Sequence, residues 1–369
     1  MTEPDRLARV ALGRIAEPGR AALLDAVTSF GAAAVLEQLL EDATLGPRLA
    51  EIDSVRELEV AARSGLRFVV PGDDEWPEGL DDLAGAGSVQ ERGGVPLGLW
   101  VRGPLRLDAL GGALAVVGSR SATTYGADLA RDVAGEVAEA ARIVVSGAAY
   151  GIDQAAHRGA ISAGAPTVAV LACGADRVYP KEHTALVARI ADDGAVVSET
   201  VPGGAAMRVR FLSRNRLIAA LTRGTVVVEA ALRSGALNTA NWAGRLNRHL
   251  MGVPGPVTSA SSAGVHQLVR TGAATLVTSG AEVLEVLSPA GEHLLSIPRG
   301  RDRARDALTE RQRLVLDAVP VARGATSSSI ARLVGLSAER AHGTLLELEM
   351  RGMVELDEAG WRLAALAHE

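Results

Sequence analysis

Leu114-Ala115-Val116-Val117-Gly118-Ser119-Arg120 is a short apolar run that ends in glycine, serine and arginine. Six further apolar runs follow along the chain, and stretches of roughly ten or more residues with helical periodicity separate most of them. The further runs are Ile143–Val145, Thr167–Leu171, Ala195–Val197, Thr225–Val228, Leu250–Val253 and Thr275–Val277. Strands without a polar face are buried on both sides. The alternation of such strands with helices predicts an α/β fold with a parallel sheet between two layers of helices.

The regions on either side of this sheet have different patterns. Residues 1–65 contain short amphipathic stretches broken by glycine, which predict a helical domain before the sheet domain at 66–288. Residues 289–306, with several proline, glycine and arginine residues, are expected to be a linker. Residues 307–369 indicate three helices and then two short strands, which is the order of a winged helix.

The composition is that of an ordinary globular protein. Of its 369 residues, 48% are hydrophobic and 22% are charged. The single cysteine, Cys173, excludes an internal disulfide and a cysteine-cluster metal site, which suits the cytoplasm, and we expect it to be a buried filler. The charged start of the chain is unlike a signal peptide, and no apolar run is long enough to span a bilayer, so we expect no membrane contact.

Positive charge is concentrated in the middle of the chain. Residues 1–111 contain 11 arginines against 19 acids, a net charge of −8, whereas residues 112–288 contain 15 arginines and one lysine against 13 acids, a net charge of +3. Residues 307–369 contain 7 arginines against 9 acids, a net charge of −2. We therefore expect a polyanionic partner to meet the sheet domain and the acidic winged helix to contact protein.

Small residues and hydroxyl groups follow several of the predicted strands, where open parallel sheets bind their ligands. Gly118-Ser119 follows the first strand, Ser146-Gly147 the second and Ser234-Gly235 the fifth. These groups allow close backbone approach at the start of a helix, which suits a phosphate, and Arg120 is placed to clamp that phosphate with two hydrogen bonds. No Gly-x-Gly-x-x-Gly dinucleotide motif is present, and no cofactor is predicted.

Further cations and aromatic residues lie in the same region. Lys181 is the only lysine among 38 basic residues, so a compact ammonium is kept there although arginine carries the positive charge elsewhere. Arg214-Asn215-Arg216 lies in a stretch without acids between 200 and 228, and it offers two guanidinium groups and an amide to a nucleic-acid backbone. Tyr150, Tyr179 and Phe211 are the candidates for base stacking.

The familiar catalytic patterns are missing from the sequence. The chain has no Ser–His–Asp order, no paired catalytic carboxylates and no Walker lysine. Asp153 and His157 are four residues apart on one predicted helix, and without a third ligand we interpret them as a structural contact, not a metal site. Phosphate cradles with cations favour binding of nucleic acid without cleavage, so we do not expect an enzyme.

These motifs occur in the order of a known family. They are Gly118-Ser119-Arg120, Ser146-Gly147-x-Ala149-x-Gly151-Ile152-Asp153-x-Ala155-Ala156-His157, Tyr179-Pro180-Lys181, Ser198-Glu199, Arg214-Asn215-Arg216, Val228-Glu229-Ala230, Ser234-Gly235 and Pro254-Gly255. Over residues 68–285 the chain resembles the DNA-processing protein A (DprA/Smf) family. The resemblance implies an extended Rossmann-like domain that binds single-stranded DNA without hydrolysing it, between a helical domain of the sterile-alpha-motif (SAM) type and a winged helix.

The resemblance also implies partners and contact residues. It implies a homodimer that protects incoming DNA, displaces single-strand binding protein and loads RecA in natural transformation or recombination. Carried over by position, the DNA-binding residues are Gly118, Ser119, Arg120, Ser146, Gly147, Lys181, Arg214, Asn215, Arg216, Ser234 and Gly235. The sequence departs from the family pattern at Leu212, Ser213, His183 and His266.

Two other functions fit parts of the sequence. Pro202-Gly203-Gly204 resembles part of the signature of the phosphoribohydrolases that activate cytokinins, but Ala205-Ala206-Met207 follows and the Gly-Thr-x-x-Glu continuation is missing. Release of a free base from nucleoside monophosphates would support that alternative. A scaffold with a vestigial site is the other alternative, and the retention of Arg120 and Lys181 argues against it.

Overall fold

The computed structural model describes residues 2–296 and 303–368. The chain forms two compact units, Met1–Leu295 and Ser296–Glu369, and each is described by itself. The linker predicted at 289–306 includes residues 297–302, which lie outside the described residues.

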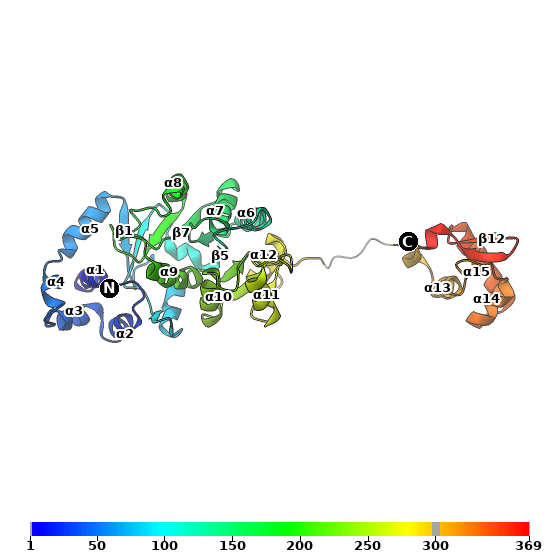
Figure 1. Ribbon diagram of the computed structural model, residues 1–369, viewed down its shortest axis with the longest axis horizontal. Helices are drawn as coiled ribbons and strands as arrows, with labels where there is room; N and C mark the ends of the chain where they lie inside the picture. The colour runs from blue at the N-terminus through cyan, green and yellow to red at the C-terminus, as the bar shows by residue number, and fades with distance from the viewer. Residues whose placement is uncertain (1, 297–302, 369) are drawn as a thin grey trace. The chain divides into compact units, whose positions relative to one another are not determined.

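The first unit is built on a nine-stranded sheet (Figure 1). All seven apolar runs form strands of this sheet, which confirms the predicted α/β class, and two further strands pair antiparallel at one edge. In spatial order the strands are β1 (Leu66–Val69), β4 (Leu99–Arg102), β8 (Ala195–Ser198), β7 (Thr167–Val170), β6 (Val144–Ser146), β5 (Leu114–Val117), β9 (Gly224–Val227), β10 (His249–Gly252) and β11 (Thr275–Leu276).

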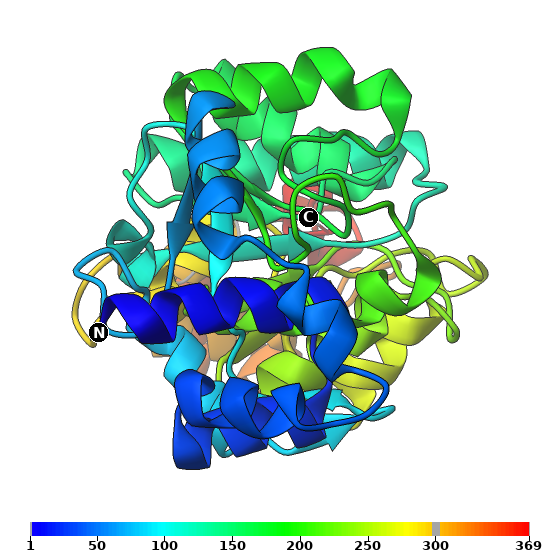
Figure 2. The ribbon, with the colours of Figure 1, turned by 90° about the vertical axis from the view of Figure 1, so that its left-hand side faces the viewer.

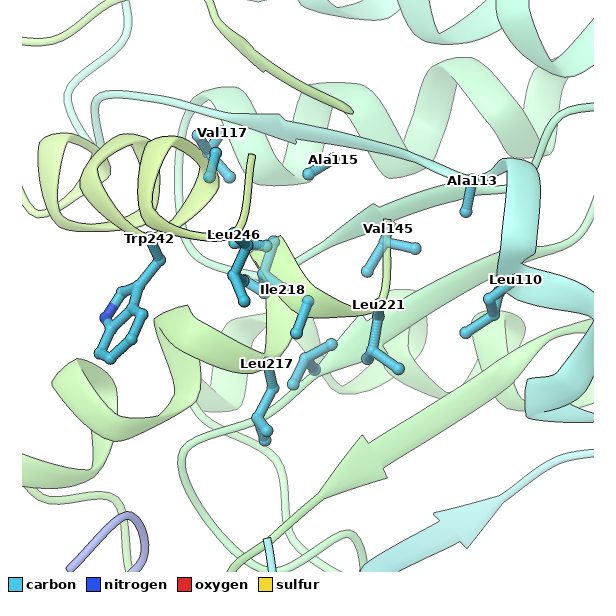
Figure 3. Packing of buried hydrophobic residues seen from close by; sticks show 14 of the residues in the cluster. Leu110, Ala113, Ala115, Val117, Val145, Leu217, Ile218, Leu221, Trp242 and Leu246 are labelled. Carbon is cyan, nitrogen blue, oxygen red and sulfur yellow. The ribbon is translucent and has the colours of Figure 1, made fainter. Parts of the chain in front are cut away.

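Helices cover both faces of the sheet because successive strand residues point to opposite sides. On one face, Leu114 and Val116 pack with α6 (Thr124–Glu139), α7 (Ile152–Ser162) and α12 (Gly280–Leu287), and Ala169 packs with α8 (Thr184–Asp193). On the other, Ala115 and Val117 pack with residues of α9 (Arg208–Ala220), α10 (Ala236–Arg245) and α11 (Ala263–Arg270). Figure 3 shows this second layer, with Leu217, Ile218 and Trp242 beside the strands.

The strand order places a topological switch point between β5 and β9. From β5 the chain moves to β6, β7 and β8 on one side, and it then returns through α9 to β9 on the other side of β5. In open parallel sheets, ligands bind in the crevice that such a reversal opens at the carboxyl ends of the strands. The loops after β5 and β9 are therefore the first place to search for a site.

Five N-terminal helices belong to the same compact unit and lie beside the antiparallel edge of the sheet (Figure 2). They are α1 (Glu3–Ile15), α2 (Ala21–Phe30), α3 (Ala32–Leu40), α4 (Gly46–Ala50) and α5 (Ser54–Arg63). Their own small core is centred on Leu12 and reaches Leu97, while α5 packs on β1. In the described residues no single helix is long and apolar enough to cross a membrane, and the one helix pair that passes by length and composition, α2 with α3, is bent by 115°.

The second unit has the element order predicted for residues 307–369. It contains α13 (Glu310–Asp317), α14 (Ser327–Val334), α15 (Ala338–Met350) and the antiparallel strands β12 (Val354–Asp357) and β13 (Gly360–Leu363). A bridge between Ala325 and Trp361 adds a third extended segment, and Trp361 is buried in a core of its own with Leu345 and Leu348. The shorter elements of the chain are β2 (Ser88–Val89), β3 (Arg92–Gly93), η1 (Glu78–Ala84), η2 (Leu107–Gly112), η3 (Lys181–His183), η4 (Ala304–Ala307) and η5 (Ala365–His368).

Candidate nucleic-acid interface

The loop after β5 is fixed to the end of β9 by a buried carboxylate. Glu229 accepts hydrogen bonds from the backbone N–H of Thr123 at 2.9 Å and from its hydroxyl at 2.7 Å. Thr123 in turn caps α6 by accepting from the N–H of Gly126. A Cβ at Gly118 would lie 2.5 Å from the side chain of Ile152, so only glycine fits there. Sequence reasoning missed this role of Glu229, which depends on a partner 106 residues away.

Arg120 lies at the mouth of this crevice with its charge available. Its side chain is exposed, and its guanidinium carbon lies 4.7 Å from the centroid of the Phe211 ring. Tyr179 meets the same ring edge-on, with 5.7 Å between the ring centroids. Within residues 2–296 and 303–368, no carboxylate lies within ion-pair distance of Arg120. A cation held by an aromatic ring and left without an acid is placed to bind an anion.

The loop after β7 places Lys181 at the same edge of the sheet. Lys181 is exposed and begins the short helix η3, next to Glu182, whose carboxylate accepts from the hydroxyl of Tyr150 at 2.7 Å. His183 is buried, and its Nδ1 lies 2.9 Å from the carbonyl oxygen of Ala148. The histidine that departs from the family pattern therefore joins the loop after β7 to the loop after β6.

Arg214 lies beneath the loop after β6. A Cβ added at Gly147 would lie 1.4 Å from Nη1 of Arg214, so the guanidinium occupies the space that any other residue would need. Asp153 accepts from the N–H groups of Gly147 and Ala149, at 3.1 and 3.4 Å, and lies 3.9 Å from Arg214. Burial raises the pKa of Asp153, and burial lowers the pKa of Arg214. The two groups form a buried pair that supports the loop.

The predicted contact between Asp153 and His157 is wrong. The carboxylate of Asp153 turns back to the loop, while Nδ1 of His157 lies 2.9 Å from the hydroxyl of Thr167. Burial lowers the pKa of His157 to about 3, so the ring is neutral at physiological pH. Among the described residues, no group of three or more histidine, cysteine or acidic side chains is placed to hold a metal ion. Cys173 is buried, as expected of a filler, and burial raises the pKa of its thiol.

Arg216, which the resemblance implies as a DNA contact, lies inside the domain. Its side chain is fully buried and forms two hydrogen bonds of 2.7 Å with the carboxylate of Glu199. It also donates to the carbonyl oxygens of Gly93 and Gly94, each at 3.2 Å. A guanidinium enclosed in this way is a structural brace and presents nothing to a strand outside.

Asn215 is also largely buried, with only 8% of its surface exposed. Its Nδ2 donates to the carbonyl oxygen of Gly235 and to Asn238, both at 3.3 Å. Asn215 therefore holds the loop after β9 through its side-chain amide. Gly235 itself is exposed, and the Ser234 hydroxyl accepts from the N–H of Ala236 at the start of α10.

The remaining predicted serines join neighbouring strands and loops. The Ser146 hydroxyl is buried and donates to the carbonyl oxygen of Val116 at 2.6 Å, which joins β6 to β5. The Ser119 carbonyl accepts from the N–H of Ile152 at 3.2 Å, so the loops after β5 and β6 meet. The structure thus brings Arg120 and Lys181 to one exposed edge and places Ser146, Asn215 and Arg216 inside.

The opposite end of the strands has the other sign of charge. A cavity of about 580 Å³ lies beside the residues that precede β5 and β9, and four acids line it together with two arginines. The acids are Asp74, Glu78, Asp82 and Asp108, and the arginines are Arg223 and Arg248. Four acids against two arginines give this lining a net charge of −2, which disfavours a polyanion at this end of the sheet.

Comparisons with known proteins agree with the motifs. The family model of DNA recombination-mediator protein A matches residues 67–288. A Mycobacterium tuberculosis protein named putative DNA processing protein DprA is 43% identical over 374 residues, which cover 98% of this chain and 95% of the relative.

Two solved structures have the same architecture. The X-ray structure of DNA processing protein A from Streptococcus pneumoniae matches with a TM-score of 0.64 and 32% identity, covering 77% of this chain and 97% of that one. The Helicobacter pylori protein, whose structure was described for its single-stranded DNA binding mode, matches with a TM-score of 0.51 and 25% identity over 61% of this chain and 97% of that one. The chain belongs to the DNA recombination-mediator protein A (DprA/Smf) family.

Proposed function

We propose that this protein binds single-stranded DNA along the carboxyl edge of its sheet and does not cleave it. The observation that carries the proposal is the exposed guanidinium of Arg120, which lies 4.7 Å above Phe211 at the switch point and has no acid beside it in the described residues. Lys181 offers a second exposed cation on the neighbouring loop. The Helicobacter pylori relative, described for its binding of single-stranded DNA, supports the same ligand here.

The arrangement suits recognition of a backbone more than recognition of a sequence. Cations at an open edge neutralise phosphates whatever base follows them, so affinity depends on salt and tolerates sequence. The buried pair of Arg214 and Asp153 holds the loop between these cations in place. Phosphate contacts of this kind position a strand without breaking a bond in it, which supports a role in protecting and presenting DNA.

We further propose that the protein loads RecA on the bound strand, in natural transformation or in recombination more generally. The name of the family, recombination mediator, supports this role. A loader must hold the strand while single-strand binding protein leaves and RecA arrives, and an open edge leaves room for the incoming protein. We propose that the protein acts as a homodimer in the cytoplasm, without a cofactor.

Replacing both exposed cations is expected to weaken DNA binding at least tenfold while the fold stays intact. The Arg120→Ala/Lys181→Ala variant loses two phosphate contacts, so the dependence of log affinity on log salt concentration falls by about 1.4. Fluorescence anisotropy of an unstructured oligonucleotide across a salt series measures both quantities. The control is Arg131→Ala/Arg189→Ala, which changes net charge equally but removes exposed arginines that pair with acids on α6 and α8.

The control variant is expected to bind almost as well as the wild type. If both double variants bind equally, the edge is not the DNA site and the family likeness extends only to the fold. In that case the next assay is release of a free base from nucleoside monophosphates, which tests the phosphoribohydrolase alternative.

The isolated second unit is expected not to bind duplex DNA at physiological salt. The exposed residues of α15 include Glu339 and Glu349, which repel phosphates, and Leu346 and Met350, which favour a protein partner. The unit has its own core, so residues 307–369 are suited to expression alone. Anisotropy with a labelled duplex measures binding, and a Glu339→Arg/Glu349→Arg variant serves as a positive control for the assay. Tight binding by the unchanged fragment would contradict this prediction.

A further inference from the structure

The tyrosines of this chain are distributed differently from its tryptophans. All four tryptophans are buried, the most exposed of them at 7%, as expected of large apolar side chains. All three tyrosines are about half exposed, at 48% for Tyr125, 42% for Tyr150 and 50% for Tyr179. Each tyrosine follows a different parallel strand, β5, β6 or β7, and so lies at the carboxyl edge of the sheet.

The three rings are held in place although they are exposed. The Tyr125 hydroxyl donates to the carbonyl oxygen of Pro254 at 2.7 Å, and the Tyr150 hydroxyl donates to Glu182 at 2.7 Å. The Tyr150 ring also meets His183 edge-on, with 4.8 Å between centroids, and the Tyr179 ring meets Phe211 in the same way at 5.7 Å. A ring that is already immobilised loses little side-chain entropy when a flat ligand stacks on it.

Phe211 differs from the tyrosines and serves another purpose. The Arg120 guanidinium covers its ring at 4.7 Å, and Arg214 lies 5.9 Å from the same centroid. A nucleobase would have to displace a cation to reach this ring. Phe211 is therefore a positioning residue that holds Arg120 over the crevice, and it is not a stacking platform.

The rings span several strands of the sheet. Tyr179 follows β7, and Tyr125 reaches the end of β10 through Pro254. In the order β7-β6-β5-β9-β10 these strands are four spacings apart, which corresponds to about 19 Å. One strand of a duplex carries one phosphate per about 3.4 Å of helix axis, so this distance exceeds the axial rise of several nucleotides. The row is long enough for several nucleotides, with Arg120 between its ends.

We infer that Tyr125, Tyr150 and Tyr179 form a stacking track for unpaired bases of any identity. The inference rests on the proposed function, because it adds base contacts to the phosphate contacts of Arg120 and Lys181. Every base has an aromatic face, so such a track favours single strands over duplexes without reading sequence. Stacking is not screened by salt in the way that ion pairs are, so the tyrosines maintain binding when the cations are screened.

An abasic strand tests the track without changing the protein. Wild-type protein is titrated with a labelled oligonucleotide and with a strand of the same length and charge in which tetrahydrofuran residues replace the bases. We expect the abasic strand, which loses all three stacks, to bind at least about a hundredfold more weakly at high salt, with a similar salt dependence. Equal binding of the two strands would overturn the track and leave the proposed DNA-binding function standing. Failure to bind either strand would overturn both.

Variants assign the effect to the three rings. Tyr125→Leu, Tyr150→Leu and Tyr179→Leu are each expected to lose about tenfold in affinity for the normal strand and almost nothing for the abasic strand. Tyr179→Phe keeps a ring and is expected to bind as the wild type does. Phe30→Leu is the matched control, because Phe30 is 74% exposed but belongs to α2. Equal losses on both strands would show that the tyrosines act only on the fold, which would contradict the proposal.

Discussion

Replacing Gly147 with alanine is expected to destabilise the protein by about 3–5 kcal/mol, the cost of breaking a buried ion pair. The new Cβ would lie 1.4 Å from Nη1 and 2.3 Å from Cζ of Arg214, so the guanidinium has to leave. Its departure leaves the carboxylate of Asp153 buried without its counter-charge. Urea denaturation measures the loss in stability, and anisotropy with single-stranded DNA measures the accompanying loss of binding.

Two further variants identify the cause. Gly235→Ala is the matched control, because a Cβ there would meet no atom within 4 Å, and we expect almost no effect on stability. Adding Arg214→Ala to Gly147→Ala removes the clash, so the double variant is expected to be far less destabilised than the sum of the single changes predicts. Simple additivity would show that Arg214 does not occupy this space.

Breaking the brace between Arg216 and Glu199 is expected to have an effect of similar size. Glu199→Gln leaves a fully buried guanidinium without its counter-charge, which costs about 3–5 kcal/mol. The variant is expected to unfold at a much lower urea concentration. Replacing both partners with apolar residues, as Arg216→Met/Glu199→Leu, is expected to recover most of the stability, because no unpaired charge remains in the interior.

The same helix supplies a control for this experiment. Arg210 of α9 pairs with Glu17 through two hydrogen bonds of 2.7 Å, like Arg216, but the Glu17 side chain is 39% exposed. Water replaces a lost partner at such a site, so Glu17→Gln is expected to cost about 1 kcal/mol or less. If Glu17→Gln and Glu199→Gln lower the free energy of unfolding by the same amount, burial does not decide the strength of the brace.

Sequence reasoning predicted the elements whose pattern is local. The apolar strands were predictable because a strand that is buried on both faces is a continuous run of apolar residues in the sequence. Arg120 was predictable because the loop that directly follows a strand in this fold reaches the ligand edge. Lys181 was predictable because it is the only lysine in a chain that otherwise uses arginine. Both are exposed at that edge, as the prediction requires.

The direction in which a side chain points is what sequence reasoning could not predict. Successive residues of a helix point about 100° apart, so Arg214, Asn215 and Arg216 of α9 cannot all face one ligand. All three are buried, and the direction of Arg216 depends on Glu199, a residue that sequence alone does not place beside α9. Asp153 and His157 are four residues apart on one helix, but they do not form the predicted contact, because the Asp153 carboxylate accepts from backbone N–H groups of the loop instead. Tyr125 was not among the predicted candidates for base stacking, because the residue that holds its ring, Pro254, is 129 residues away in the sequence.

The contacts around α9 also limit how this protein can be rearranged in evolution or in the laboratory. Pro18 accepts from Ser213, the N–H of Gly19 donates to Glu199, and Glu17 pairs with Arg210, so residues 17–19 interlock with a helix from the middle of the chain. A chimaera that took its first helices from a relative would inherit only one half of each contact. Exchange of that segment between homologues requires that residues 199, 210 and 213 travel with it, although almost 200 positions separate the two parts in the gene.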